Sequence, residues 1–127
     1  MNTPTRIRKA AEATADKLMR DLRGVKAVVI ATEDGFEVAG RMEEPAHIGR
    51  LAALASSLAA LGALAGDEGK LGECDNVGIE AALGHLLMVR ARNETADLII
   101  CILSSRDAVI GQVLYMAKQA ARELRRA

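Results

Sequence analysis

The chain has 127 residues, of which 50% are hydrophobic and 27% charged, as is typical of a folded globular domain with a real core. Its 17 Lys and Arg residues balance its 17 Asp and Glu residues, so no net field attracts nucleic acid or anionic lipid. Phe36 and Tyr115 are the only aromatic residues in the sequence, which argues against a protein that stacks the bases of single-stranded nucleic acid.

The first helix is predicted to begin at Thr3-Pro4, where Thr3 can serve as the N-cap and Pro4 occupies the first turn. Its apolar residues recur at helical spacing and form one narrow stripe, made of Ile7, Ala11, Ala15, Leu18 and Leu22. Gly24 is expected to end the helix as its C′ residue. The rest of the helix surface is charged, so we expect one side only to face the core.

A β-hairpin is predicted to follow this helix. Val25–Thr32 is a largely β-branched apolar run, typical of a strand that is buried on both faces. Glu33-Asp34-Gly35 is expected to be a turn, because Gly35 can adopt a positive φ. Phe36, Val38 and Gly40 then alternate with Glu37, Ala39 and Arg41, which predicts an edge strand with one covered face.

The second helix is predicted to run from near Pro45 to about Leu64, and it lacks a charged face. Its larger apolar residues share one broad stripe, made of Ile48, Leu51, Leu54, Ala55, Leu58, Leu61, Gly62 and Ala65. The opposite side is small and uncharged, and it carries Gly49, Ala52, Ala53, Ser56, Ala60 and Ala63. Because one sheet covers only one side of a helix, we expect a second surface to cover another side.

The remaining sequence predicts a loop, three strands and a helix. Gly66–Gly78 lacks Ser or Thr after Gly69-Lys70, so we interpret it as a flexible connector and not as a phosphate loop. Short links between the strands require antiparallel neighbours, and the expected strands are Asn76–Ala82, His85–Ala91 and Ala96–Leu103. The last helix is expected to be capped by Ser104, Ser105 or Asp107 and to bury Ile110, Val113, Leu114, Ala117, Ala121 and Leu124.

This order of elements predicts an α+β fold with a mainly antiparallel five-stranded sheet and helices on both of its faces. We expect one domain over residues 1–127, with residues 1–3 as a disordered tail. Cys74 and Cys101 are too few for a disulfide framework, so both are expected to be reduced thiols. No apolar signal segment opens the chain, and Leu51–Gly66, the longest uncharged stretch, is short for a membrane span. We therefore expect a soluble, cytoplasmic protein without membrane insertion.

No set of residues in the sequence predicts catalysis. His47 and His85 lie far apart, and neither has partners at metal-ligand spacing. Asp34 belongs to the predicted turn, and Glu43-Glu44 lies where carboxylates favour the positive end of a helix dipole. We therefore expect no catalytic residue, no metal and no cofactor, and a chain that is not an enzyme.

The pattern as a whole resembles the Roadblock family. The resemblance rests on Gly24-Val25 before a strand, Asp34-Gly35 before a short second strand, the Ala- and Leu-rich second helix and the three-strand meander. The last helix, with Gly111 in its first turns and a basic end, fits as well. The family includes dynein light chains of the Roadblock type and bacterial MglB-like regulators of small Ras-like GTPases.

The resemblance implies a dimer in which the second helices pack side by side and the strand after them pairs with its copy. Carried over to this sequence, it implies a homodimer interface made of Ile48, Leu51, Ala55, Leu58, Gly62, Asn76, Val77, Gly78 and Ile79. It also implies a small Ras-like GTPase as partner, which the protein would activate or scaffold. The expected partner-binding surface lies on the second helix and includes His47, Arg50, Ala53 and Ser57.

Two alternative functions stay open at this point: a small-ligand sensing domain and a purely structural dimerisation module. A sensor needs a pocket with convergent polar groups. The residues that are predicted to face inward are nearly all aliphatic, which disfavours the sensing domain.

Overall fold

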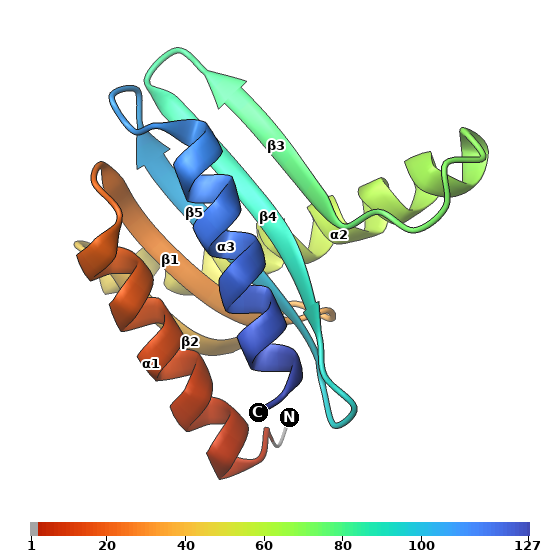
Figure 1. Cartoon of the computed structure of the whole chain (residues 1–127), viewed down its shortest axis with the longest axis horizontal. Helices are drawn as coiled ribbons and strands as arrows, with labels where there is room; N and C mark the ends of the chain where they lie inside the picture. Colours follow the sequence, from red (N-terminus) through yellow and green to blue (C-terminus); the bar gives the residue numbers. More distant parts are fainter. Residues whose placement is uncertain (1–2) are drawn as a thin grey trace.

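The computed structural model describes residues 3–127, which fold as a layered α+β unit (Figure 1). These residues form a five-stranded sheet in the order β2-β1-β5-β4-β3, with antiparallel neighbours throughout. The helices are α1 (Thr5–Asp21), α2 (Ile48–Glu68) and α3 (Ile110–Arg125), and a short 3-10 turn, η1 (Pro45–His47), precedes α2. The strands are β1 (Val25–Thr32), β2 (Glu37–Met42), β3 (Asn76–Ala81), β4 (Gly84–Arg92) and β5 (Asp97–Ser105). The predicted fold class and element order are confirmed. Of the predicted disordered tail, residues 1 and 2 lie outside the described residues.

Helices cover both faces of the sheet and create two cores. In Figure 1, α1 and α3 lie side by side over one face, while α2 crosses behind the strands on the other. The larger core joins α1 and α3 to the sheet and contains Ile30, Leu98 and Ile100. The smaller core lies under α2 and includes Val29 and Cys101. The interaction surfaces of the molecule therefore differ between the two faces.

The central strands β1 and β5 are buried on both sides, as their apolar sequences predict. Val29 pairs with Cys101 and Ile30 pairs with Ile100, one pair facing each core. Both strands lie between the two helix layers, so their middle residues are buried on both faces and polar residues occur only at the strand ends.

β2 is an edge strand, but both of its faces are covered. Val38 and Ala39 are both buried in the core of α1 and α3, because the β1–β2 ladder is irregular between Ile30 and Ala31. The covering helix comes so close that a Cβ on Gly40 would lie 2.6 Å from Cγ2 of Ile48. Phe36 precedes the strand and is 54% exposed. The prediction of one covered face is therefore wrong, because α2 begins directly over this strand.

The ends of α1 differ from the prediction. Pro4 occupies the N-cap position without any side-chain cap, so Thr3 does not cap the helix. Leu22 is the C-cap, and Gly24 lies beyond it in the turn to β1 with a φ of 83°. The Ser105 N–H donates to the Gly24 carbonyl over 2.8 Å. The glycine therefore serves the turn against β5 and does not end the helix.

α2 is longer than predicted, because it continues through Gly66 to Glu68. A side chain at Gly66 would collide with the carbonyl oxygen of Gly72, so glycine is needed inside the helix here. The chain reverses directly afterwards, where the Leu71 N–H donates to the Gly66 carbonyl over 2.8 Å and Gly72 adopts a φ of 86°. The predicted Gly66–Gly78 connector is reduced to residues 69–75.

α3 begins without a side-chain cap, and Val109 occupies its N-cap position. Ser104 and Ser105, which were candidate caps, belong to β5 and pair with β4, and Asp107 lies in the turn that follows. Three proposed caps are therefore wrong, because the sheet extends further than the apolar run of β5 indicates. The buried side of α3 consists of Val113, Ala117, Ala120, Ala121 and Leu124.

Candidate protein-interaction surface

α2 packs on the sheet with its small residues. Its buried positions are Ile48, Ala52, Ala55, Ala59, Gly62 and Gly66. By contrast, Leu54, Leu61 and Leu64 are 44%, 60% and 55% exposed. The sequence predicts that two sides of this helix are covered, and the structure shows which side the sheet covers.

Bulky strand residues explain this orientation. The sheet presents Val29, Met88 and Ile99 to α2, and all three are fully buried. A helix can approach such a surface closely only with small side chains. At Gly62 there is no room for a side chain, because a Cβ there would lie 2.6 Å from Sγ of Cys74 in the loop before β3. The large leucines are consequently left on the outer side.

The outer side of α2 is an exposed apolar surface, which we call the α2 outer surface. It is formed by Ala53, Leu54, Ala60, Leu61, Leu64 and Ala65, all of which are exposed. No charged residue occurs along the helix between Arg50 and Asp67. Contiguous exposed apolar surface of this kind is typical of interaction sites.

Polar contacts hold α2 in this position. The Ser56 hydroxyl donates to the Glu33 carbonyl over 2.6 Å. Arg90 donates from Nη2 to the Ala59 carbonyl over 2.9 Å, and its Nη1 lies 3.1 Å from Oε1 of Glu33. The Arg90 side chain is only 11% exposed, so it bridges the helix and the β1–β2 turn from below. Sequence reasoning missed this role, although an arginine inside a buried strand is a signal for it.

An apolar groove of about 580 Å³ runs beside the C-terminal half of α2. It is lined chiefly by Leu58, Leu61, Ala65, Leu71, Cys74 and Val77. Leu71, on the loop that follows the helix, is 81% exposed. Figure 1 shows this half of α2 projecting past β3, beyond the cover of the sheet. The groove therefore joins the α2 outer surface to the outer strand.

β3 is the outer strand of the sheet on this side. The Arg90 N–H donates to the Asp75 carbonyl over 3.0 Å, while Asn76 stands opposite Val89. This geometry makes Asn76 and Val89 a non-hydrogen-bonded pair, and the alternation of an antiparallel ladder then points the Gly78 N–H away from β4. β3 therefore presents backbone donors at the outer edge of the sheet.

The residues predicted as a dimer interface separate into three groups. Ile48, Ala55 and Gly62 lie under the helix and are covered by the chain's own sheet. Leu51 and Leu58 lie half-buried on the flank of α2. The rest are consecutive on β3, where Val77 and Ile79 share the α2 side of the sheet: Asn76, Val77, Gly78 and Ile79.

The residues predicted to bind a partner lie on the outer side of α2 or at its start. Arg50, Ala53 and Ser57 are exposed, and the Ser57 hydroxyl donates to the Ala53 carbonyl over 3.3 Å. His47 belongs to η1, and its Nε2 lies 2.9 Å from Oε2 of Glu44. The structure thus brings three of the four residues together on one helix side.

His, Cys, Asp and Glu side chains are the candidates for binding a metal or acting as a nucleophile. Within residues 3–127, no group of three or more His, Cys, Asp or Glu side chains could hold a metal ion. Burial raises the pKa of the Cys101 thiol to about 12, so this thiol stays protonated and is a poor nucleophile at neutral pH. Asp34 accepts a hydrogen bond from the Thr32 hydroxyl over 2.6 Å, which stabilises the β1–β2 turn.

Pro45–Glu68, which is η1 and α2 together, is long and apolar enough to cross a membrane, and 28% of its most apolar window is buried. Short loops connect the N-terminal end of this helix to β2 and its C-terminal end to β3. Its inner side packs on the sheet to which both strands belong. Crossing a bilayer would separate these contacts.

Comparisons of the sequence with protein-family models and with curated proteins give no match. Solved structures do match over nearly the whole chain. A Roadblock/LC7 domain from Streptomyces avermitilis has a TM-score of 0.82 at 22% identity, covering 91% of this chain and 94% of that one. The chain has the Roadblock fold. The resemblance to Roadblock domains that the sequence indicates is thereby confirmed for the fold.

Two structures of MglB share this Roadblock fold. MglB from Myxococcus xanthus has a TM-score of 0.80 at 19% identity, covering 99% of this chain and 92% of that one. An MglB with a tetrameric arrangement has a TM-score of 0.80 at 20% identity, with the same coverage of 99% and 92%. The α2 outer surface and the β3 edge described above thus belong to a chain with the Roadblock fold.

Proposed function

We propose that this Roadblock domain is a non-catalytic, cytoplasmic interaction module that forms a homodimer and binds a small Ras-like GTPase. The observation that carries the proposal is the α2 outer surface, an apolar helix side that adjoins an outer strand. The fold shared with two MglB structures supports it, because the MglB-like proteins that the sequence resembles regulate small Ras-like GTPases.

The homodimer would form through β3 and the adjoining flank of α2. Two copies of β3 would pair and extend the sheet, which covers an edge that otherwise invites aggregation. Leu51 and Leu58 lie two helical turns apart on the same flank, so they would meet the partner helix together with Leu61. Ile48, Ala55 and Gly62 would act indirectly, by letting α2 lie close to the sheet. The tetrameric arrangement of one MglB supports self-association.

The GTPase would bind across the outer sides of the two α2 helices. Arg50, Ala53 and Ser57 would contribute from each copy, with His47 at the edge. Ala53 and Ser57 are small, so another protein can approach the helix closely, and Arg50 is the residue type that supplies binding energy in interfaces. The dimer would act by holding the GTPase switch loops in one arrangement, because its contacts differ between the two nucleotide states.

The test is binding of purified protein to small GTPases of the same organism, each loaded with GDP or a GTP analogue. Arg50→Ala should weaken binding by about 1–2 kcal/mol and leave the dimer intact. Arg23→Ala is the matched control, since Arg23 is exposed in the α1–β1 turn and should leave binding unchanged. The protein alone should not hydrolyse GTP.

Two results would contradict the proposal. One is hydrolysis of GTP by the purified protein without a partner. The other is a lack of binding to every small GTPase of the organism in both nucleotide states, which would favour a structural dimerisation module.

The apolar groove beside α2 favours a small-ligand sensing domain as the second candidate. Its volume of about 580 Å³ is large enough for a small organic molecule. The groove lies on the surface that the proposed dimer covers, so an apolar ligand would compete with dimerisation. A sensing domain would therefore show a ligand-dependent change of molecular mass.

A further inference from the structure

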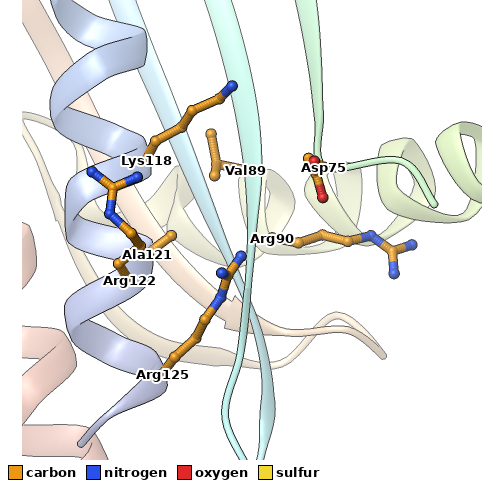
Figure 2. Close-up of a pocket in the computed structure, with 7 residues that line it drawn as sticks. All are labelled: Asp75, Val89, Arg90, Lys118, Ala121, Arg122 and Arg125. Atoms are coloured by element: carbon orange, nitrogen blue, oxygen red, sulfur yellow. The ribbon is translucent and has the colours of Figure 1, made fainter.

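A second surface lies on the opposite face of the sheet, between α3 and β3. Lys118, Arg122 and Arg125 of α3 line a hollow of about 260 Å³ above Val89 of β4 (Figure 2). Their spacing places all three on one flank of the helix. Figure 2 shows Lys118 and Arg125 reaching from α3 toward β4, with Asp75 beyond that strand. We call this surface the cationic groove.

The charges of the cationic groove are not neutralised by the part of the chain that the structure describes. Ion pairs within residues 3–127 involve other cations and none of these three. Arg90 also lines the hollow but extends away from α3 (Figure 2), toward the Ala59 carbonyl. Because the whole chain has a formal net charge of zero, the positive potential here is local.

The three cations are not needed to finish α3. The amide of Asn93 donates to carbonyls of the last helical turn, over 2.8 Å to Leu124, 3.2 Å to Arg125 and 3.0 Å to Ala127. The C-terminal carbonyls of the helix therefore have a donor from the β4–β5 turn. The cationic side chains remain available to bind a ligand.

A second hollow of about 290 Å³ lies further along β4. Leu87 lies two positions from Val89 on the same side of β4, and it lines this second hollow together with Gly78 and Ile110. With a rise of about 3.3 Å per residue, the stretch of β4 from His85 to Val89 is about 13 Å long. This length suits about four residues of an extended polypeptide.

The charges at the two sides of the groove indicate the chemistry of its occupant. Carboxylates would face the cations of α3, while Asp75 on the opposite side calls for a hydrogen-bond donor. An extended polypeptide has both, because its acidic side chains and its backbone N–H groups can point in opposite directions. A lone anion would have nothing to offer Asp75.

We infer that the cationic groove binds an acidic, extended segment of a protein partner. Carboxylates of the segment contact Lys118, Arg122 and Arg125, and its apolar side chains lie over Val89 and Leu87. The site is on the face of the sheet that carries α3, whereas the α2 outer surface is on the other face. The inference therefore does not depend on the proposed GTPase binding.

The test is fluorescence anisotropy with a labelled polyglutamate peptide at several salt concentrations. The wild-type chain should bind the peptide and lose affinity as salt rises, since the contacts are electrostatic. The double variant Lys118→Glu with Arg122→Glu should bind roughly tenfold more weakly or worse. Lys9→Glu with Lys26→Glu is the matched control, because both lysines are exposed on other elements and the change in net charge is the same.

Thermal unfolding of both double variants shows that each is folded. Equal loss of affinity in the two variants would overturn the inference, because net charge alone would then explain binding. Binding to phosphatidylserine vesicles without binding to the peptide would also overturn it, in favour of a lipid surface. Loss of GTPase binding in the Lys118→Glu and Arg122→Glu variant, with the dimer intact, would contradict a site separate from the α2 outer surface.

Discussion

At the residue scale, Asn93 connects a turn to a helix end that is distant in the sequence. It is 8% exposed, and its Nδ2 reaches three carbonyls at the end of α3. Its Oδ1 accepts a hydrogen bond from the Thr95 N–H over 2.8 Å. One side chain thus satisfies the orphan acceptors of a helix terminus and shapes the β4–β5 turn.

Asn93→Ala should lower the free energy of unfolding by about 1–3 kcal/mol, because buried carbonyls lose their donor. Urea unfolding at one fixed protein concentration measures this change. The control is Thr95→Ala: its hydroxyl accepts from Arg6 at the exposed surface over 3.1 Å, and its loss should change stability by less than about 0.5 kcal/mol. Equal effects of the two substitutions would contradict the role assigned to Asn93.

The sequence predicts the role of a residue whose partners lie within a few positions of it, but not the role of a residue whose partners are distant in the chain. Asp34 and Gly35 were predicted as turn residues because turn chemistry acts over a few positions, and Gly35 does adopt a φ of 97°. The role of Asn93 depends on carbonyls 31 to 34 positions away, which no local pattern reveals. Ser104 and Ser105 failed as caps for α3 for the same reason, since both residues pair with β4 and belong to the sheet.

At the scale of elements, α2 and β3 together determine the candidate interface. The sequence indicates that α2 has no charged side between Arg50 and Asp67, and this could be read without the structure. Which side the sheet covers could not, because the answer depends on the bulk of Met88 and Ile99 beneath the helix. The sequence also indicated β3 as a short strand, while its N–H directions follow only from the observed register with β4.

Gly78→Pro should weaken the dimer, because it removes a backbone donor that points away from β4 toward the outer edge. Proline is tolerated at an edge position of this kind, so the monomer should stay folded. Gly78→Ala is the matched control, since a Cβ at this position meets nothing within 4 Å and the N–H is kept. Equal dimer dissociation constants for both variants, measured by analytical ultracentrifugation, would place the pairing elsewhere.

At the scale of the whole molecule, the two faces of the sheet divide the surface by character. The face with α2 is apolar and adjoins the β3 edge, while the face with α1 and α3 carries the cationic groove (Figure 1). A dimer formed through β3 would join two sheets side by side, so both copies of each face would point the same way. The dimer would then present a continuous α2 side and a pair of cationic grooves on the opposite side.

The dimer itself is the last prediction. Light scattering after size exclusion at low concentration should give twice the chain mass of 13.5 kDa. Leu61 is 60% exposed in the single chain, so Leu61→Arg should fold but place two charges in the apolar interface of a symmetric dimer. A buried unpaired charge costs on the order of 3–5 kcal/mol, so the dissociation constant of the dimer should rise by roughly a hundredfold or more. Tyr115→Arg, at a side chain 64% exposed on α3, is the control and should stay dimeric. A monomeric wild-type chain would contradict the prediction, because the exposed leucines of α2 would then stay in contact with water.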